Sequence, residues 1–296
     1  MGAPRPLHVV TAILVGAYLG RRGLRKGSLS KSGAMAAFAV AVLTWGSGPR
    51  FGITLIAFYL SGSKLSRVGA ATKMRQDEAA TEGGARDAAQ VLCCSLPAAV
   101  PAALAAAAYR AEIGDDARTD LTANTRGTML VARFVAFFAV CAGDTWASEL
   151  GCLAAAPPRL VTAPWRVVPP GTNGGVTLAG TAASVAGGAF VGVVHGLAGF
   201  ATVGASAAGA RAEVAGLAAL GAAAGFAGSL LDSVLGATLQ RTSFDDEKRC
   251  VARPERSDAR ALCGADVLSN HGVNLASATA VMLAAPGAAR WWLLRA

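Results

Sequence analysis

Two acidic residues end a long apolar run that begins near Met129. Asp144 and Glu149 belong to the motif Gly143-Asp-Thr-Trp-Ala-Ser-Glu-Leu-Gly151. Carboxylates at the edge of a membrane segment often belong to a functional site, because burying them in lipid is costly. Five positions correspond to about 140° around a helix, so both acids face one ion only if the helix breaks between them. The flanking glycines could provide that break; the alternative is two carboxylates held by packing partners or basic loops.

A second acidic motif has the same spacing, G-x4-S-x2-G. It reads Gly228-Ser-Leu-Leu-Asp-Ser-Val-Leu-Gly236, and Asp232 is the only acidic residue of its apolar run. Either two helices present acids to a shared site, or the similarity reflects the small residues that dominate both windows. Mg²⁺ prefers carboxylate, water and phosphate oxygens. We therefore predict Asp144, Glu149 and Asp232 as catalytic residues and Mg²⁺ ligands.

Basic and glycine-rich motifs at the ends of other apolar runs could bind phosphate. Lys and Arg neutralise phosphate oxygens, and glycine lets backbone N–H groups approach an anion closely. A polar turn before a helix that Thr177 could cap would add the helix N-terminus to such a site. The predicted substrate-binding residues are Lys64, Arg67, Lys73, Gly171, Thr172, Asn173, Gly174, Gly175, Asn270, His271 and Asn274.

Each of these assignments has a structural alternative. The basic residues that follow Ser61 could instead anchor the chain to anionic lipid. The 171–175 segment could be a turn that simply needs glycine dihedral angles. His271 opens the last apolar run and could contact substrate or transfer a proton. His195 lies in the middle of a run between Gly192 and Gly196, which favours a helix contact over a ligand.

The elements that must position these residues are membrane helices. Hydrophobic residues make up 53% of the 296 residues and charged residues only 15%, far more apolar surface than one soluble core needs. Long Ala, Gly, Leu and Val runs without strand-like alternation predict an all-α polytopic helical bundle. Although the net charge is +9, the basic residues lie between apolar runs without interleaved aromatics, so we expect no nucleic-acid partner.

Residues 1–296 are expected to form a single integral membrane domain with a charged loop at 240–271. Two of the candidate spans are short for a bilayer, which needs roughly 20 helical residues, so they could form a hairpin or one broken span. We therefore expect about seven to eight transmembrane helices, with the helix near Pro97 and Pro101 kinked. The candidate spans cover residues 7–20, 33–46, 51–62, 89–109, 127–150, 176–203, 213–239 and 272–294.

The distribution of Lys and Arg predicts how these spans are oriented. With eight spans, the loops at 21–32, 63–88, 151–175 and 240–271 fall on one side of the membrane and carry eighteen of the 27 basic residues. An excess of basic residues marks the cytoplasmic side or its equivalent. Every polar glycine motif then lies on this basic side of the membrane. The lipid bilayer itself is an expected partner of the chain.

Taken together and in order, the motifs resemble those of the transmembrane protein 19 family, which includes the plant phytyl-phosphate kinase. The resemblance covers Ser61 to Asn274 and includes Gly-Thr-Asn-Gly-Gly-Val-Thr and Asn-His-Gly-Val-Asn. It implies transfer of a phosphoryl group from a nucleoside triphosphate, CTP in the plant case, to a prenyl or phytyl monophosphate. The implied substrate is an isoprenoid phosphate, and the implied location is the chloroplast envelope or the endoplasmic reticulum.

We therefore expect a membrane kinase that acts on a lipid phosphate at the basic-side interface. The alternative is a multi-pass transporter or lipid carrier, because an intramembrane acid and broken helices also suit a substrate path. Inverted repeats would favour the transporter, whereas the two acidic motifs are expected to leave the membrane on the same side. No feature of the sequence defines the oligomeric state.

Overall fold

The computed structural model describes residues 6–80, 85–113, 125–203, 207–253 and 258–292. Its helices are α1 (Pro6–Arg25), α2 (Lys31–Ser47), α3 (Pro49–Leu65), α4 (Ala70–Gln76), α5 (Ala88–Cys93), α6 (Leu96–Ile113), α7 (Thr125–Gly151), α8 (Leu178–Val203), α9 (Ala207–Leu239) and α10 (Asn270–Trp292). Its strands are β1 (Arg159–Leu160), β2 (Ala163–Val167), β3 (Gly175–Val176), β4 (Thr242–Asp245), β5 (Cys250–Val251) and β6 (Arg260–Cys263). The chain is a helical membrane protein, as its composition predicts.

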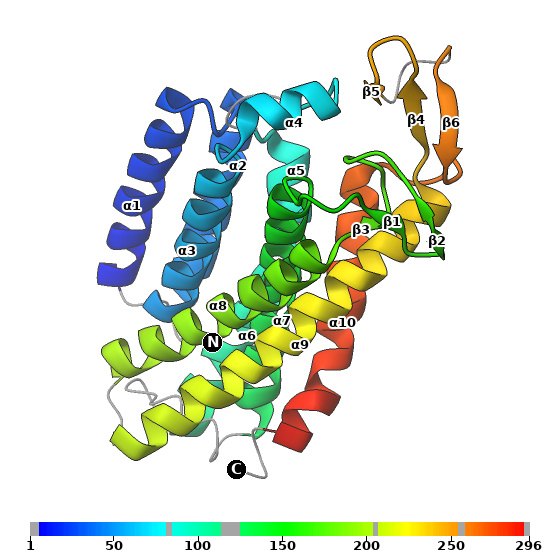
Figure 1. Cartoon of the computed structure of the whole chain (residues 1–296). Helices are drawn as coiled ribbons and strands as arrows, with labels where there is room; N and C mark the ends of the chain where they lie inside the picture. The colour runs from blue at the N-terminus through cyan, green and yellow to red at the C-terminus, as the bar shows by residue number, and fades with distance from the viewer. Residues whose placement is uncertain (1–5, 81–84, 114–124, 204–206, 254–257, 293–296) are drawn as a thin grey trace.

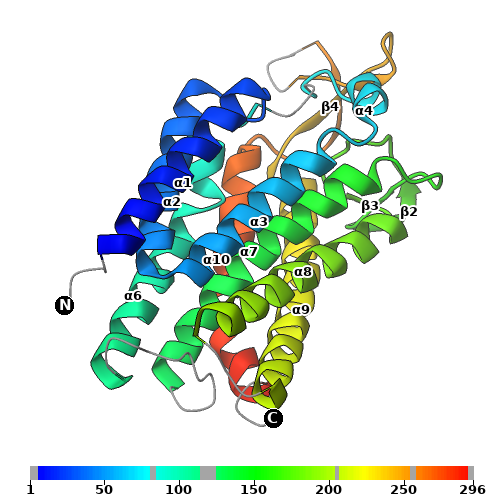
Figure 2. The same cartoon turned by 90° about the vertical axis from the view of Figure 1, so that its left-hand side faces the viewer.

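Successive long helices run in alternating directions through the bundle. Figure 1 and Figure 2 show α4 and the strands at one end of the bundle, whereas α6 and α8 finish and α7 and α9 begin at the other end. The four basic connections between helices therefore lie at the same end. This confirms the predicted common side for the polar glycine motifs.

Helix α7 occupies the centre and packs against α3, α6, α8, α9 and α10. A helix that is apolar on all sides is buried by its neighbours, and the side chains of Phe134, Phe137 and Phe138 have no exposed surface. The rings of Phe134 and Phe138 meet edge to face at 5.0 Å. The middle of the bundle is therefore a closely packed apolar core.

Helices α8 and α9 approach closely through small residues. A Cβ atom on Gly188 would overlap the carbonyl oxygen of Gly221, and a Cβ atom on Gly221 would overlap that of Gly188. Without a hydrophobic force between helices in lipid, such close packing supplies much of the attraction. Glycines on both helices therefore allow α8 and α9 to pack with their backbones in contact.

The short second and third apolar runs form a helical hairpin. Ser30 accepts a hydrogen bond from Gly33 N at the start of α2, and Gly48 with φ +156° separates α2 from α3, where Pro49 occupies the first turn. Proline suits that position because the first N–H groups of a helix lack intrahelical partners. The next apolar run is interrupted at Cys94 between α5 and α6, just before Pro97, which accounts for the predicted kink.

Four of the described helices are long and apolar enough to cross a membrane by length and composition. They cover Ala88–Tyr109, which combines α5 with most of α6, and Arg126–Gly151, Leu178–Ala201 and Gly209–Leu239. Helices α2 and α3 have 17 residues each, less than a full span needs. The expected number of seven to eight spans therefore stays a prediction.

Two three-stranded antiparallel sheets occupy the connections after α7 and α9, with strand orders β2-β1-β3 and β5-β4-β6. The sequence does not predict these sheets, because strands of two to five residues are too short for alternation to be visible. The second sheet lies in the charged 240–271 loop and is attached to the end of α4, where Glu78 N donates to Val251 O at 3.0 Å. This loop is therefore partly ordered by pairing.

His195 is a packing residue, as predicted. Its side chain is fully buried on α8 beside the rings of Phe51 and Phe134. The Nδ1 atom lies 2.9 Å from the Thr54 hydroxyl on α3, close enough for a hydrogen bond. The contact joins α3 to α8 within the apolar core.

Candidate functional site

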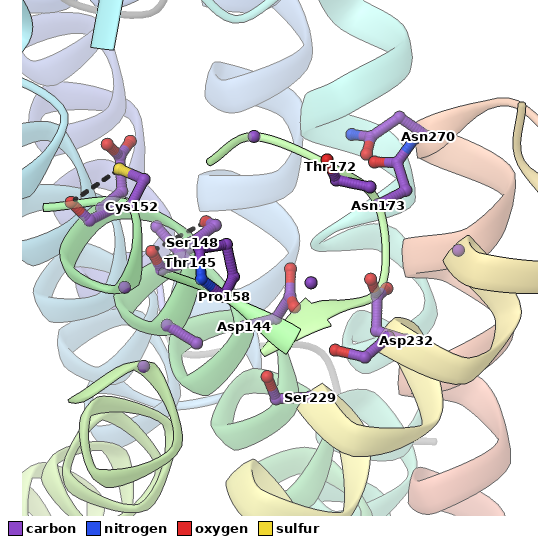
Figure 3. Close-up of a pocket in the computed structure, with 18 of the residues that line it drawn as sticks. Asp144, Thr145, Ser148, Cys152, Pro158, Thr172, Asn173, Ser229, Asp232 and Asn270 are labelled. Carbon is purple, nitrogen blue, oxygen red and sulfur yellow. Dashed lines mark hydrogen bonds between the residues drawn. The ribbon is translucent and has the colours of Figure 1, made fainter. Parts of the chain in front are cut away.

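A polar cavity of about 580 Å³ lies at the end of the bundle that carries the strands. Figure 3 shows side chains from α7, α9 and α10 around it, with the loop that carries Thr172 and Asn173 above. The predicted site residues that line it are Lys73, Asp144, Glu149, Gly171, Thr172, Asn173, Gly174, Gly175, Asp232, Asn270 and Asn274. Motifs that are distant in the sequence thus share one cavity, and the chemical roles of these residues stay predictions.

Asp144 on α7 and Asp232 on α9 face this cavity from neighbouring helices (Figure 3). Asp232 Oδ2 accepts a hydrogen bond from Ser277 Oγ at 3.0 Å. It accepts a second at 3.0 Å from the Asn274 amide nitrogen, in the amide orientation that satisfies both groups. Ser229 of α9 lines the same cavity as Asp144. In the part of the chain that the structure describes, Asp232 therefore has neutral hydrogen-bond partners, and neither carboxylate forms an ion pair.

The repeated glycine spacing in the two acidic motifs reflects one helix contact. A Cβ atom on Gly143 would lie 2.8 Å from Gly225 Cα. A Cβ atom on Gly228 would overlap the side chain of Val140. Both glycines let α7 and α9 approach closely, which brings the acid that follows each of them to the same cavity. The predicted shared site of Asp144 and Asp232 therefore has a geometric basis.

Glu149 lies in a different environment. Its Oε2 atom is 2.5 Å from Lys73 Nζ, and its Oε1 atom accepts a hydrogen bond from Ser66 Oγ at 2.5 Å. Helix α7 is continuous from Thr125 to Gly151, so the helix break that would let Glu149 share an ion with Asp144 is absent. The expected helix break is therefore wrong, whereas the assignment of Glu149 as a catalytic residue and Mg²⁺ ligand stays a prediction. Glu149 forms an ion pair that joins α4 to α7, and Asp144 and Asp232 are the described lining carboxylates without a basic partner.

Arg86 is a basic residue of the cavity that belongs to none of the predicted motifs. Its Nη1 and Nη2 atoms donate to Ser63 Oγ at 3.2 Å and Ser66 Oγ at 3.3 Å. Its backbone pairs with the α1–α2 connection, where Ser30 N donates to Arg86 O at 3.0 Å. Burial lowers the pKa of the guanidinium, and the nearby Glu149 carboxylate opposes that shift. Arg86 and Lys73 are the basic side chains among the described lining residues.

The Gly171–Gly175 turn is held by the protein itself. Gly171 and Gly174 have φ of +87° and +75°, in the left-handed region that favours glycine. Gly174 also lies against α9, where an added Cβ atom would be 2.6 Å from Ser233 O. Asn173 N donates to Thr242 Oγ1 at 3.2 Å, and Gly175 N donates to Thr172 O at 2.9 Å. The turn therefore needs its glycines for conformation, and only part of its N–H groups can serve a ligand.

The start of α8 faces the same cavity. Thr177 Oγ1 accepts a hydrogen bond from Gly180 N at 3.0 Å, which confirms Thr177 as the predicted cap. Thr177, Gly180 and Thr181 all line the cavity. The positive end of a helix dipole and the N–H groups of the first turn favour an anion at this position.

Three predicted substrate-binding residues lie outside the cavity lining: Lys64, Arg67 and His271. Lys64 and Arg67 are exposed, and Arg67 Nη2 donates to Lys26 O at 2.8 Å. Their position favours the alternative assignment, contact with the membrane surface. His271 is half-buried on α10, and its enclosed Nδ1 atom lacks a partner within the described residues.

The cavity fits a divalent cation that arrives with a phosphorylated ligand. Among the described residues, no group of three or more His, Cys, Asp or Glu side chains is arranged to hold a metal ion. Mg²⁺ is commonly bound by one or two carboxylates together with substrate phosphates and water. Asp144 and Asp232 provide two such carboxylates in the cavity wall, so the donor set matches a shared metal–phosphate site rather than a protein-only cage.

The chain is similar in sequence to known proteins, among them a family of integral membrane proteins. Residues 14–282 match the model of the family described as integral membrane protein DUF92. The chain is also 35% identical over 272 residues to Protein PGR of Arabidopsis thaliana, an alignment that covers 91% of this chain and 92% of that protein. No solved structure matches the chain. The matched region includes every motif that lines the cavity.

Proposed function

The chain belongs to the integral membrane protein family DUF92, and from this premise we propose that it is a membrane kinase for isoprenoid phosphates. The reaction is transfer of the γ-phosphoryl group of a nucleoside triphosphate, with CTP as the candidate donor, to a prenyl or phytyl monophosphate. The membership agrees with the resemblance to the transmembrane protein 19 family. The chloroplast envelope and the endoplasmic reticulum are the locations proposed with this activity.

One observation carries the proposal: two carboxylates without basic partners among the described residues line the same cavity as two basic side chains. Asp144 and Asp232 supply the negative charge that a metal-bound nucleotide requires, and Lys73 and Arg86 supply positive charge for phosphate oxygens. A bound cation would neutralise the two carboxylates, and the ligand phosphate would face Arg86 and the Lys73 side chain, which is also paired with Glu149. Phosphoryl transfer depends mainly on such positioning and charge stabilisation.

The residues of the cavity have distinct proposed roles. Asp144 and Asp232 would hold Mg²⁺, which when bound neutralises the phosphate charge that develops during transfer. Arg86, whose planar guanidinium can form two parallel hydrogen bonds, orients the acceptor phosphate. The start of α8 provides N–H groups for the donor phosphates. A phosphate monoester is already nucleophilic near neutral pH, so no side-chain base is required.

Two features favour the kinase over a transporter or lipid carrier. Helices α7 and α9, which carry the repeated acidic motifs, run in the same direction (Figure 1), whereas many transporters are built from inverted repeats. The core beyond the cavity is filled by the fully buried rings of Phe134, Phe137 and Phe138. Both features suit a reaction at one face of the membrane.

The direct test is an assay of the purified protein in lipid nanodiscs. Prenyl monophosphate is supplied with each nucleoside triphosphate in turn and Mg²⁺, and the diphosphate is quantified by mass spectrometry. We expect diphosphate with at least one donor and none when Mg²⁺ is removed by a chelator. Binding of the lipid phosphate without product from any donor would refute the kinase proposal and favour the lipid-carrier alternative.

A further inference from the structure

A second, apolar cavity lies between α1, α2, α3 and α5, with a volume of about 100 Å³. Small and aliphatic side chains make up most of its wall, and each of the first three helices contributes some of them. They include Leu19 and Gly20 of α1, Ala37 and Ala41 of α2, and Leu55 and Ile56 of α3. Such a wall offers hydrocarbon an apolar surface.

The apolar cavity adjoins the polar one. Four residues line both: Arg86, Gln90, Thr145 and Asn274. Gly62 of α3 lies at the same junction, where a Cβ atom would be 3.5 Å from Arg86 Nη2 and 3.5 Å from Thr145 Cγ2. A path lined by aliphatic groups therefore ends at a guanidinium in the wall that also carries the Asp144 and Asp232 carboxylates.

We propose that the apolar cavity binds the hydrocarbon chain of the acceptor, a single-chain isoprenoid monophosphate whose phosphate lies at Arg86. This inference rests on the proposed kinase activity for the identity of the acceptor. Charge complementarity carries the assignment, because a phosphate monoester requires a cation at the point where its apolar chain begins. Arg86 is the basic residue shared by the described linings of the two cavities.

The position of the apolar cavity also suits delivery from the bilayer. The outer faces of α1 and α2 carry exposed apolar side chains, including Leu14, Tyr18, Met35 and Phe38. A chain that enters from this lipid-facing side stays in an apolar environment until its phosphate meets Arg86, so it avoids the cost of exposing hydrocarbon to water. The nucleotide would then enter the polar cavity from its aqueous end.

The cavity is narrow where α1 meets α2. A Cβ atom added to Gly16 on α1 would lie 3.4 Å from the Cβ atom of Ala41 on α2. A Cβ atom added to Gly20 would lie 3.9 Å from that of Ala34. Larger side chains at such positions would shorten the cavity. This close packing suits the single chain of a monoalkyl phosphate better than the two chains of a diacyl lipid.

A matched pair of substitutions on one helix tests the inference. Ala41 lines the apolar cavity, whereas Ala39 is exposed on α2 and lies outside the cavity lining. We expect Ala41→Phe to lower kcat/KM for a long-chain prenyl monophosphate by about tenfold or more, because excluding even two or three methylene groups from an apolar site has that effect. Ala39→Phe should leave it unchanged, and a short-chain acceptor should be less affected by Ala41→Phe.

Photocrosslinking of the unaltered protein tests the same site without turnover. The probe is a prenyl monophosphate with a diazirine on its terminal isoprene unit. We expect adducts on peptides from α1, α2 and α3, and their loss with excess unlabelled prenyl monophosphate but not with a prenyl alcohol. Adducts confined to α8, α9 or α10, or equal effects of the two Phe substitutions, would overturn the inference.

The two proposals can fail separately. Competed adducts at α1 to α3 in a protein that makes no diphosphate from any donor would keep the lipid-phosphate site and remove the kinase activity. Diphosphate formation with adducts elsewhere would keep the kinase and remove this site. Competition by phosphatidic acid as strong as that by prenyl monophosphate would refute the preference for a single chain.

Discussion

Lys73 on α4 and Glu149 on α7 form an ion pair, with 2.5 Å between Nζ and Oε2. Their side chains are 11% and 20% exposed, so the pair is only partly screened by water. Lys73 Nζ also donates to Leu65 O at 3.0 Å at the end of α3. Helix α4 has seven residues, too few to be stable alone, so these contacts fix its position at the cavity.

Removing either charge of this pair should loosen α4. We expect Glu149→Gln to lower the free energy of unfolding by about 1–3 kcal/mol, since it leaves Lys73 partly buried without its counter-charge. Thermal unfolding in detergent measures the change. The double variant with Lys73→Met should be less destabilised than the sum of the single variants. Strictly additive losses would mean that the two side chains do not depend on each other.

Asp144→Asn and Asp232→Asn should abolish turnover while the protein stays folded. Each change removes a carboxylate that has no basic partner among the described residues, so we expect kcat to fall by about a thousandfold or more through loss of metal and phosphate positioning. Diphosphate formation at saturating Mg²⁺ gives the readout. Asp266→Asn is the matched control, because Asp266 is exposed and lies outside the cavity lining. Normal turnover by Asp144→Asn would remove its assigned role.

Arg86→Lys should raise KM for the acceptor more than KM for the nucleotide. Lysine keeps the charge but cannot reproduce the planar fork that bonds Ser63 and Ser66 and that would orient a phosphate. A rise of about tenfold in the acceptor KM corresponds to loss of one charge-assisted hydrogen bond. Steady-state kinetics with each substrate varied in turn provide the measurement. Equal rises for both substrates would contradict the assignment of Arg86 to the acceptor.

Cys152 offers a probe of the cavity through its pH dependence. Burial raises the pKa of its thiol, while the Lys73 ammonium opposes the shift. Only the thiolate reacts with maleimide, so labelling of a variant that keeps Cys152 alone should increase with pH and reach its midpoint above that of an ordinary thiol. Because Cys152 lines the cavity, bound Mg²⁺-nucleotide should slow labelling.

The control for this experiment is a variant that keeps only Cys250. This residue is 6% exposed and lies in β5, outside the cavity lining. Its labelling should be slow at every pH and insensitive to nucleotide. Equal protection of both cysteines would indicate a global change in structure rather than occupation of the cavity.

Gly188→Ala should destabilise the bundle. Its new Cβ atom would overlap the Gly221 carbonyl oxygen, and forcing α8 from α9 typically costs about 1–3 kcal/mol. Gly46→Ala on α2 is the comparison, since nothing lies within 4 Å of its added Cβ atom. That change should be neutral or slightly stabilising, because Ala favours a helix more than Gly does. Similar melting temperatures for the two variants would refute the close contact.

The sequence alone determined the class of the protein, its helix directions and most of the residues that meet in the cavity. The bilayer sets the length that each apolar segment needs, and the charges of each loop set its side of the membrane. Both signals can therefore be interpreted without knowledge of the fold. The glycine-flanked motifs at the ends of those runs, including those of Asp144 and Asp232, therefore pointed to one end of the bundle in advance.

Only the tertiary structure decided how the charges at that end are paired. The packing of α7 against α4 lets Glu149 form an ion pair with Lys73. Asp144 stays in the cavity wall with Asp232. Arg86 reaches the cavity because its backbone pairs with Ser30, a contact between segments that no local pattern encodes. Lys64 and Arg67 lie outside the cavity for a related reason: the direction of a side chain at a helix end depends on the neighbouring helices and loops.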